Sequence, residues 1–152
     1  MKKVLIALDY NPSAQKVAES GYEYAKAIGA KVALVHIITS PEYYAVEYSP
    51  IMGYKGFYSE NSNIMMDEVN TEANNFLASS ADHLGDTNIE TYTLEGDTTE
   101  RILEFGKEWG ADLIVMGSHR QHGITRLLTE DIAVHVLKHS NIALLTIPTN
   151  DK

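Results

Sequence analysis

The chain has 152 residues, of which 44% are hydrophobic and 22% charged, so it is long enough for one domain with a buried core. Its formal net charge is −9, and the stretch from Gly56 to Glu100 holds ten acidic residues and no Lys or Arg. Such a surface repels phosphate backbones, which argues against nucleic acid as a partner. The chain has no cysteine, which excludes disulfides and thiolate chemistry.

The first apolar stretch runs from Val4 to Leu8 and ends at Asp9. It is too short to span a membrane, and it lacks the small-residue cleavage pattern of a signal peptide. We therefore expect a cytoplasmic protein that has no membrane partner.

Five short segments along the chain predict β-strands. Four are apolar runs of the kind that is typical of strands buried on both faces of a parallel sheet, and the third segment in chain order alternates between its two sides. The five segments are residues 4–8, 31–38, 89–94, 112–116 and 142–147. Four segments between them repeat apolar residues at helical spacing, and three of these segments stop at a glycine. They are residues 12–28, 65–84, 98–109 and 124–139.

The regular alternation of strand and helix predicts a single α/β domain over residues 1–149. We expect a five-stranded parallel sheet in the order 3-2-1-4-5, with right-handed crossovers and helices on both faces. Ligands of such sheets bind beyond the carboxyl ends of the strands, where the strand order reverses. Those ends are Asp9, Ile38-Thr39, Glu95-Gly96 and Gly117-Ser118.

The connection over residues 40–63 is unusual, because it is long, contains Pro and Gly, and is rich in tyrosine. Aromatic side chains with polar tips favour interfaces. The part from Tyr43 to Tyr58 is therefore a candidate lid over the site or a surface for a protein partner. An insertion without a function is the alternative.

The segment from Met116 to Pro148 combines a strand that ends in Gly117, a polar loop and a helix. Backbone N–H groups at such a helix N-terminus can bind an anion, although many junctions of this kind bind nothing. This segment resembles the universal stress protein A family. The resemblance extends to the blocks Ile6-Ala7-Leu8-Asp9, Gly29 to Ile37 and Ala111 to Ser118. It implies a Rossmann-like fold of the adenine nucleotide alpha hydrolase-like type.

ATP-binding members of the family carry Gly-x-x-Gly, nine residues, and then Gly-Ser or Gly-Thr. The first glycine matches Gly117, which Ser118 follows, but the next positions fall on Arg120, Glu130 and Asp131. A side chain in place of glycine obstructs a close phosphate, and two carboxylates repel it. Gly123 is present, but at a different place in the pattern. The loop is therefore degenerate, no cofactor is expected, and ATP or AMP remains the alternative ligand.

The resemblance also assigns roles to residues of the first two strands. Asp9 matches an acidic residue that lies near the ribose in nucleotide-binding members, while capping of the following helix is its other interpretation. Ile37 and Ile38 fall where the adenine pocket touches backbone, and simple core packing is the alternative for both.

His135 and His139 lie four residues apart on a predicted helix, a spacing that can hold a metal ion. Neither the His-Glu-x-x-His pattern nor a cysteine supports such a site, so we expect no metal.

The sequence has no nucleophile elbow, Walker motif or paired-carboxylate site, so we expect a protein that is not an enzyme. A stress-responsive interaction or sensing protein is the first hypothesis. A nucleotide-binding switch or slow nucleotidase is the second. We also expect a homodimer, because the last strand, Ile142 to Ile147, is an apolar strand at a sheet edge, and the resembling family often pairs these strands.

Overall fold

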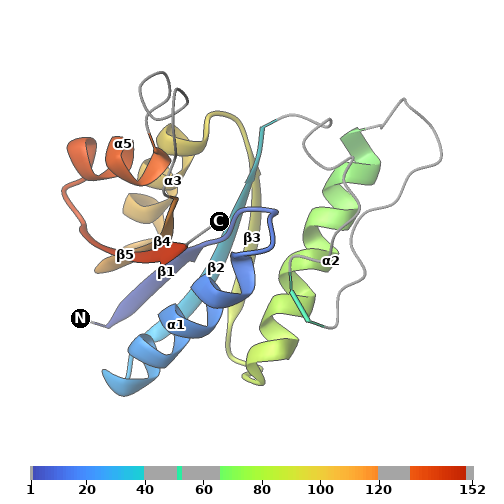
Figure 1. Cartoon of the computed structure of the whole chain (residues 1–152), viewed down its shortest axis with the longest axis horizontal. Coiled ribbons are helices and arrows are strands. Elements are labelled where there is room, and N and C mark those ends of the chain that lie inside the picture. The colour runs from blue at the N-terminus through green and yellow to red at the C-terminus, as the bar shows by residue number, and fades with distance from the viewer. Residues whose placement is uncertain (1, 40–50, 53–65, 120–130, 150–152) are drawn as a thin grey trace.

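The computed structural model describes residues 2–39, 51–52, 66–119 and 131–149. Within these ranges one parallel sheet has the order β3-β2-β1-β4-β5, which confirms the predicted topology (Figure 1). The strands are Lys3–Ala7 (β1), Lys31–Ile38 (β2), Glu90–Glu95 (β3), Leu113–His119 (β4) and Ala143–Thr149 (β5). The helices are Ala14–Ala27 (α1), Met66–Leu84 (α2), Thr98–Trp109 (α3) and Ile132–His139 (α5).

The sheet separates two apolar layers, because successive side chains of a strand point to opposite faces. Val4 and Ile6 of β1 belong to the layer that includes residues of α1 and α2. Leu5, between them, belongs to the layer that includes residues of α3 and α5. The helices therefore cover both faces, and the carboxyl ends of all five strands meet at one edge.

Helix α3 has the bounds that the sequence predicts, and its ends explain why. The Asp97 side chain accepts a hydrogen bond of 3.0 Å from the Glu100 N–H, which caps the first turn. At the other end Gly110 has φ 82°, a left-handed conformation that suits glycine and ends the helix.

The helix predicted over residues 124–139 is wrong at its start. Asp131 has φ −62° and ψ 137°, which is extended backbone, so no helix passes through it. Its side chain accepts a hydrogen bond from the Ala133 N–H, and α5 begins at Ile132. The apolar spacing persists across this position, but an Asp that caps a helix outweighs the periodicity. Residues 124–130 lie outside the described ranges.

Two residues of the long connection after β2 are described, and both contact the body of the domain. Ile51 is 1% exposed and belongs to the core layer that holds Phe76 of α2. The Met52 N–H donates a 2.9 Å hydrogen bond to Gln15 Oε1 on α1. The connection is therefore fixed to the core at this point. The rest of the segment from Tyr43 to Tyr58 lies outside the described residues.

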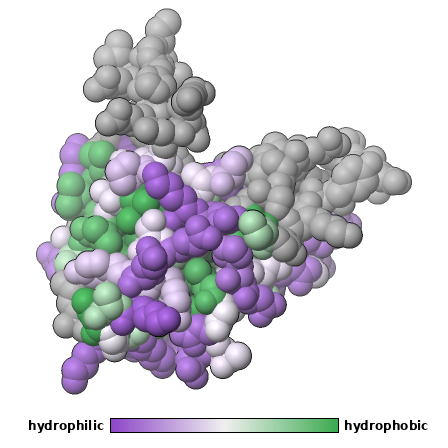
Figure 2. Space-filling view, turned by 60° about the horizontal axis from the view of Figure 1, so that its bottom comes forward, coloured by the Kyte–Doolittle hydropathy of each residue, from purple (hydrophilic) through white to green (hydrophobic). Residues whose placement is uncertain are grey.

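The surface has a mixed character. Figure 2 shows a face on which hydrophilic residues predominate and hydrophobic residues are scattered among them. In the part of the chain that the structure describes, no helix combines the length and apolar character needed to cross a membrane.

Candidate functional site

A narrow cleft opens between the carboxyl ends of β1 and β4, where the strand order reverses. Its volume is about 10 Å³, which is room for about one water molecule, so a larger ligand would lie across its mouth. Its lining comes from three strand or turn segments and two helices. The lining residues are Ala7, Asp9, Asn11, Ser13, Ala14, Val17, Ile102, Met116 and Gly117.

Asp9 is exposed and lines this cleft, directly after β1. The side chain of Asn11 accepts a 2.9 Å hydrogen bond from the Ser13 N–H and another bond from the Ser13 hydroxyl, so Asn11 organises the start of α1. The Asp9 carbonyl accepts the Asn11 N–H at 2.9 Å. Asn11 therefore supplies a side-chain contact to Ser13 at the start of α1, while Asp9 lines the cleft.

Gly117 lies in the same cleft, and the packing of α1 explains why a glycine stands there. A Cβ atom at this position would lie 3.0 Å from Val17 Cγ2 of α1 and 3.3 Å from Thr149 Cγ2 of β5. Contacts of 3.0 Å are too short for carbon atoms. Glycine therefore lets α1 approach β4, a structural reason that is independent of any ligand.

Ser118 and Asp131 meet at the junction between β4 and α5. The Ser118 hydroxyl donates a 3.1 Å hydrogen bond to Asp131 Oδ2, and Asp131 Oδ1 accepts the Ala133 N–H at 3.3 Å. A carboxylate thus lies at the N-terminus of α5, where the helix dipole and free N–H groups favour negative charge. The chain itself supplies an anion at this helix end.

Ile37 and Ile38 fit the packing interpretation. Ile37 is buried in the layer with α3 and α5, and Ile38 in the layer with α1 and α2. The Ile38 carbonyl accepts the Gly96 N–H at 3.1 Å. Both side chains therefore stabilise the core, and one backbone carbonyl is already engaged in joining β2 to the end of β3.

Three of the residues singled out from the sequence, Arg120, Gly123 and Glu130, lie outside the described residues. The site as described therefore brings together Asp9 and Gly117 in the cleft, with Ser118 and Asp131 beside it.

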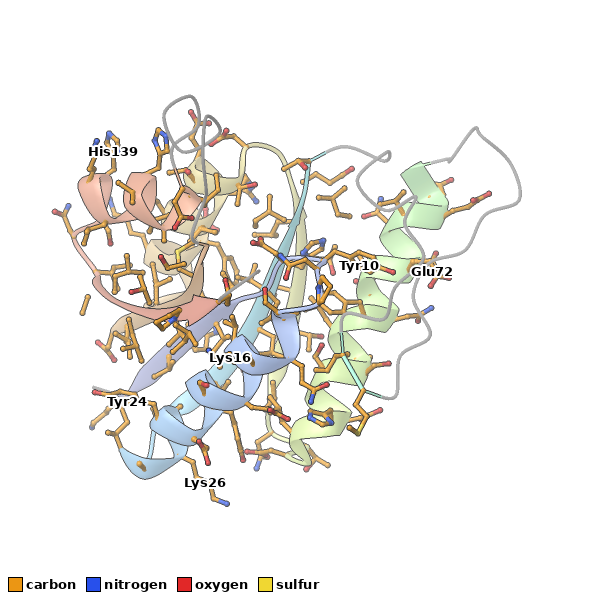
Figure 3. All side chains as sticks on the ribbon, in the orientation of Figure 1. Tyr10, Lys16, Tyr24, Lys26, Glu72 and His139 are labelled. Atoms are coloured by element: carbon orange, nitrogen blue, oxygen red, sulfur yellow. The ribbon has the colours of Figure 1, made fainter. Side chains whose placement is uncertain are left out.

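His135 and His139 line an open groove of about 430 Å³ between α3 and α5, and Figure 3 shows His139 at the end of α5. The groove also holds Asp97 and Glu100. Within the described ranges, no three His, Asp or Glu side chains are arranged to hold a metal ion. The His139 Nδ1 instead donates to the His135 carbonyl at 2.9 Å, within the helix itself.

One buried polar residue that contacts the backbone next to Asp9 was not predicted from the sequence. His36 of β2 is 3% exposed, and its Nδ1 lies 2.7 Å from the Leu8 carbonyl oxygen. Burial lowers the pKa of this imidazole below its usual value, although the bond to Leu8 and the charge of Asp9 act in the opposite direction. The sequence feature that could have identified His36 is its place as a single histidine among the apolar residues of a predicted strand.

Comparison with known proteins identifies the family. A model of the Universal stress protein family matches residues 1–148. The chain belongs to the universal stress protein family. Universal stress protein A homolog 1 of Coxiella burnetii is 29% identical over 128 residues, which cover 84% of this chain and 83% of that protein.

Solved structures of other universal stress proteins share the fold. A universal stress protein in complex with cAMP has a TM-score of 0.68 at 18% identity, with 97% of each chain covered. The universal stress protein from Archaeoglobus fulgidus in complex with dAMP has a TM-score of 0.63 at 18% identity, and the match covers 97% of this chain and 98% of that one.

Proposed function

We propose that this universal stress protein is a non-enzymatic sensing or interaction protein of the cytoplasm. We further propose that its sheet-edge cleft binds an adenine nucleotide weakly, with a modified phosphate end. The position of the cleft at the reversal of strand order supports a ligand there. Two proteins of the same fold, with cAMP and with dAMP bound, support the adenine nucleotide class.

One observation carries the proposal: the Asp131 carboxylate lies at the N-terminus of α5 and accepts hydrogen bonds from Ser118 and Ala133. A phosphate at this helix end would meet a fixed negative charge. At an effective dielectric constant of about 20, two like charges about 4 Å apart repel each other by roughly 4 kcal/mol before screening. The helix N-terminus therefore favours ligands that carry little negative charge at this end.

Calorimetry of the wild type with ATP and magnesium, and separately with cAMP, tests this proposal. We expect weak ATP binding or none, and a sub-micromolar dissociation constant for ATP would overturn it. Asp131→Ser removes the charge and introduces the hydroxyl of the family pattern, so it should strengthen ATP binding. Asp131→Asn is the matched control, because the amide keeps the size and an acceptor oxygen for Ala133 while it removes the charge.

A slow nucleotidase is the second candidate, since a nucleotide at the cleft would be exposed to water. Chromatography of ATP incubated with the protein distinguishes the two functions. We expect no loss of ATP above a protein-free control. Turnover that disappears in a cleft variant such as Asp9→Asn would instead establish the enzymatic function.

We also propose that the protein is a homodimer that pairs through the last strand. β5 is an edge strand of the described sheet, and its residues Leu144, Leu145 and Ile147 are only partly buried. The neighbouring helix α5 exposes Val134 and Leu137. A second copy would cover this edge and bury these side chains. Light scattering should report twice the monomer mass, and a monomer at tens of micromolar, where stable interfaces persist, would contradict this.

The role of the segment from Tyr43 to Tyr58 as a lid or partner surface remains a prediction. Pull-downs with and without the segment test it. Loss of captured proteins from a deletion variant that still folds would support the role, and unchanged capture would contradict it.

A further inference from the structure

The buried imidazole of His36 contacts the backbone of Leu8, the residue before Asp9 of the cleft. Its ring packs edge-on against Phe76 of α2, with centroids 5.6 Å apart and planes at 87°. Tyr10, the residue after Asp9, also packs against the Phe76 ring, with centroids 5.3 Å apart and planes at 73°. Figure 3 shows Tyr10 at the end of β1, on the side of α2. His36 therefore belongs to an aromatic cluster that joins α2 to the segment carrying Asp9, and its ring cannot turn freely.

The contact with Leu8 determines which nitrogen of His36 carries hydrogen. A carbonyl oxygen only accepts hydrogen bonds, so Nδ1, at 2.7 Å from the Leu8 oxygen, is the protonated nitrogen. The Leu8 N–H donates to the Val35 carbonyl at 2.9 Å. Both polar groups of Leu8, the residue before Asp9, are thus held by β2. The chain therefore leaves β1 in a fixed direction, which sets where the Asp9 carboxylate lies.

We propose that His36 is the positioning residue for Asp9, and that protonation of its imidazole weakens ligand binding at the cleft. This inference rests on the proposed function, because it assumes that Asp9 contacts the ligand. His36 acts through Leu8 and Asp9 and does not line the cleft itself.

The groups around His36 explain the effect of a proton. Asp9, at the end of β1, attracts a charged imidazole, and this attraction competes with its contact to a ligand. Thr93 of β3 is the register partner of His36, and its buried hydroxyl has no hydrogen-bond partner among the described residues. From α2 come Phe76 and, one turn earlier, the half-buried Glu72. A cation here draws Asp9 inward and away from the cleft mouth.

The pH range follows from the burial of the ring. Because burial lowers the pKa of His36 below the usual value of an imidazole, the ring is neutral at neutral pH and takes up its proton at a lower pH than an exposed histidine does. Ligand binding that requires neutral His36 falls by at most roughly tenfold per pH unit below that pKa, the limit for linkage to one proton.

Titration calorimetry with cAMP from about pH 8 to about pH 5, the range in which an imidazole changes charge, tests the inference. The phosphodiester of cAMP does not titrate in this range, so the pH dependence belongs to the protein. His36→Asn places an amide N–H close to the position of Nδ1 and cannot be protonated, so it should bind cAMP with little pH dependence. His36→Phe keeps an aromatic ring without a donor or a titrating group, so it should bind cAMP several-fold more weakly than the wild type does at about pH 8, with little further pH dependence. Equal pH dependence in the wild type and His36→Asn would overturn the inference.

Two-dimensional NMR of the wild type gives a readout that needs neither ligand nor variant. The amide signals of Asp9 and Tyr10 should shift with the same midpoint as the His36 ring protons. Signals that stay still while His36 titrates would overturn the positioning role. If cAMP binds at no pH while these amides follow His36, the nucleotide proposal fails and the coupling between His36 and Asp9 stands.

Discussion

The two ends of the sheet use carboxylates in opposite ways. At the amino end, Glu90 of β3 accepts hydrogen bonds from Lys31 at 2.6 Å, the Tyr92 hydroxyl at 2.6 Å and Trp109 Nε1 at 3.0 Å. At the carboxyl end, Asp9 is exposed in a cleft, and Asp131 lies at the N-terminus of α5. The amino end engages its charges in holding strands to helices. The carboxyl end places its carboxylates in or beside the cleft, with Asp131 also joining Ser118 of β4 to the start of α5.

Further contacts strengthen the amino end. Lys3 Nζ donates to the Trp109 carbonyl at 2.5 Å and lies 4.3 Å from the centroid of the Trp109 ring. The Asp112 carboxylate accepts the N–H groups of Lys2 and Lys3 at 2.9 and 3.0 Å. These contacts join residues more than a hundred positions apart, so they stabilise the tertiary fold rather than any local element.

The largest expected effect tests whether the long connection after β2, which leaves the carboxyl end of the sheet, contributes to the stability of the fold. Ile51→Ala should lower the free energy of unfolding by about 2–5 kcal/mol, the range for truncating a buried Ile. Met52→Ala is the matched control, because Met52 is 66% exposed and should cost little. Chemical denaturation of both variants measures the difference. Equal stabilities would show that the burial of Ile51 contributes nothing, and the connection would then belong entirely to the functional end.

The second largest expected effect concerns ATP binding at the carboxyl end of the sheet. Arg120→Gly, Glu130→Gly and Asp131→Ser together restore the family pattern after Gly117, so ATP should bind at least tenfold more tightly, about 1.4 kcal/mol. Calorimetry with ATP and magnesium measures the gain. Stability should change little by comparison with Ile51→Ala. Unchanged ATP affinity in the folded triple variant would mean that the pocket is closed elsewhere.

A smaller effect compares one carboxylate at each end of the sheet. Asp9→Asn should weaken cAMP binding by roughly tenfold, the scale of one hydrogen bond to a charged group, and leave stability unchanged. Glu90→Gln should do the reverse, with a loss of about 1 kcal/mol in unfolding free energy, kept small because the side chain is partly exposed. Thermal melts and calorimetry on both variants measure the pair. A loss of cAMP affinity in Glu90→Gln would remove the contrast between the ends.

The sequence predicted most of the fold because local signals agree with the tertiary arrangement. Apolar runs predicted the strands. Asp97 at the start and Gly110 at the end limit α3 to the residues that the sequence predicts. The start of α5 was missed because the apolar spacing continues through Asp131, and only its extended backbone reveals the break. The burial of Ile51 has no sequence signal, since an isolated Ile in a tyrosine-rich stretch resembles a loop residue.

The candidate site was predicted in part for a similar reason. Topology alone brings Asp9 and Gly117 to one edge of the sheet, so the sequence could identify them. The hydrogen bond between Ser118 and Asp131 and the contact of His36 with Leu8 depend on side-chain orientation, which periodicity does not encode. A residue that acts through a neighbour's backbone, as we infer for His36, looks like any core residue in the sequence.

The smallest expected effect concerns acid stability and compares the two ends of a single strand. Hydrogen bonds from Lys31, Tyr92 and Trp109 lower the pKa of Glu90 from 4.5 to about 2. The folded protein therefore binds a proton at Glu90 less readily than the unfolded chain does. The stability that these bonds provide is fully present above about pH 4.5 and is lost as the pH falls toward about 2. Glu90→Gln should show a flatter loss of stability in this window than the wild type. Glu95→Gln, which alters the exposed carboxylate at the other end of β3, is the control and should follow the wild-type curve. Denaturant unfolding at several pH values measures both, and parallel curves for wild type and Glu90→Gln would show that the amino-end carboxylate is as solvated as one at the carboxyl end.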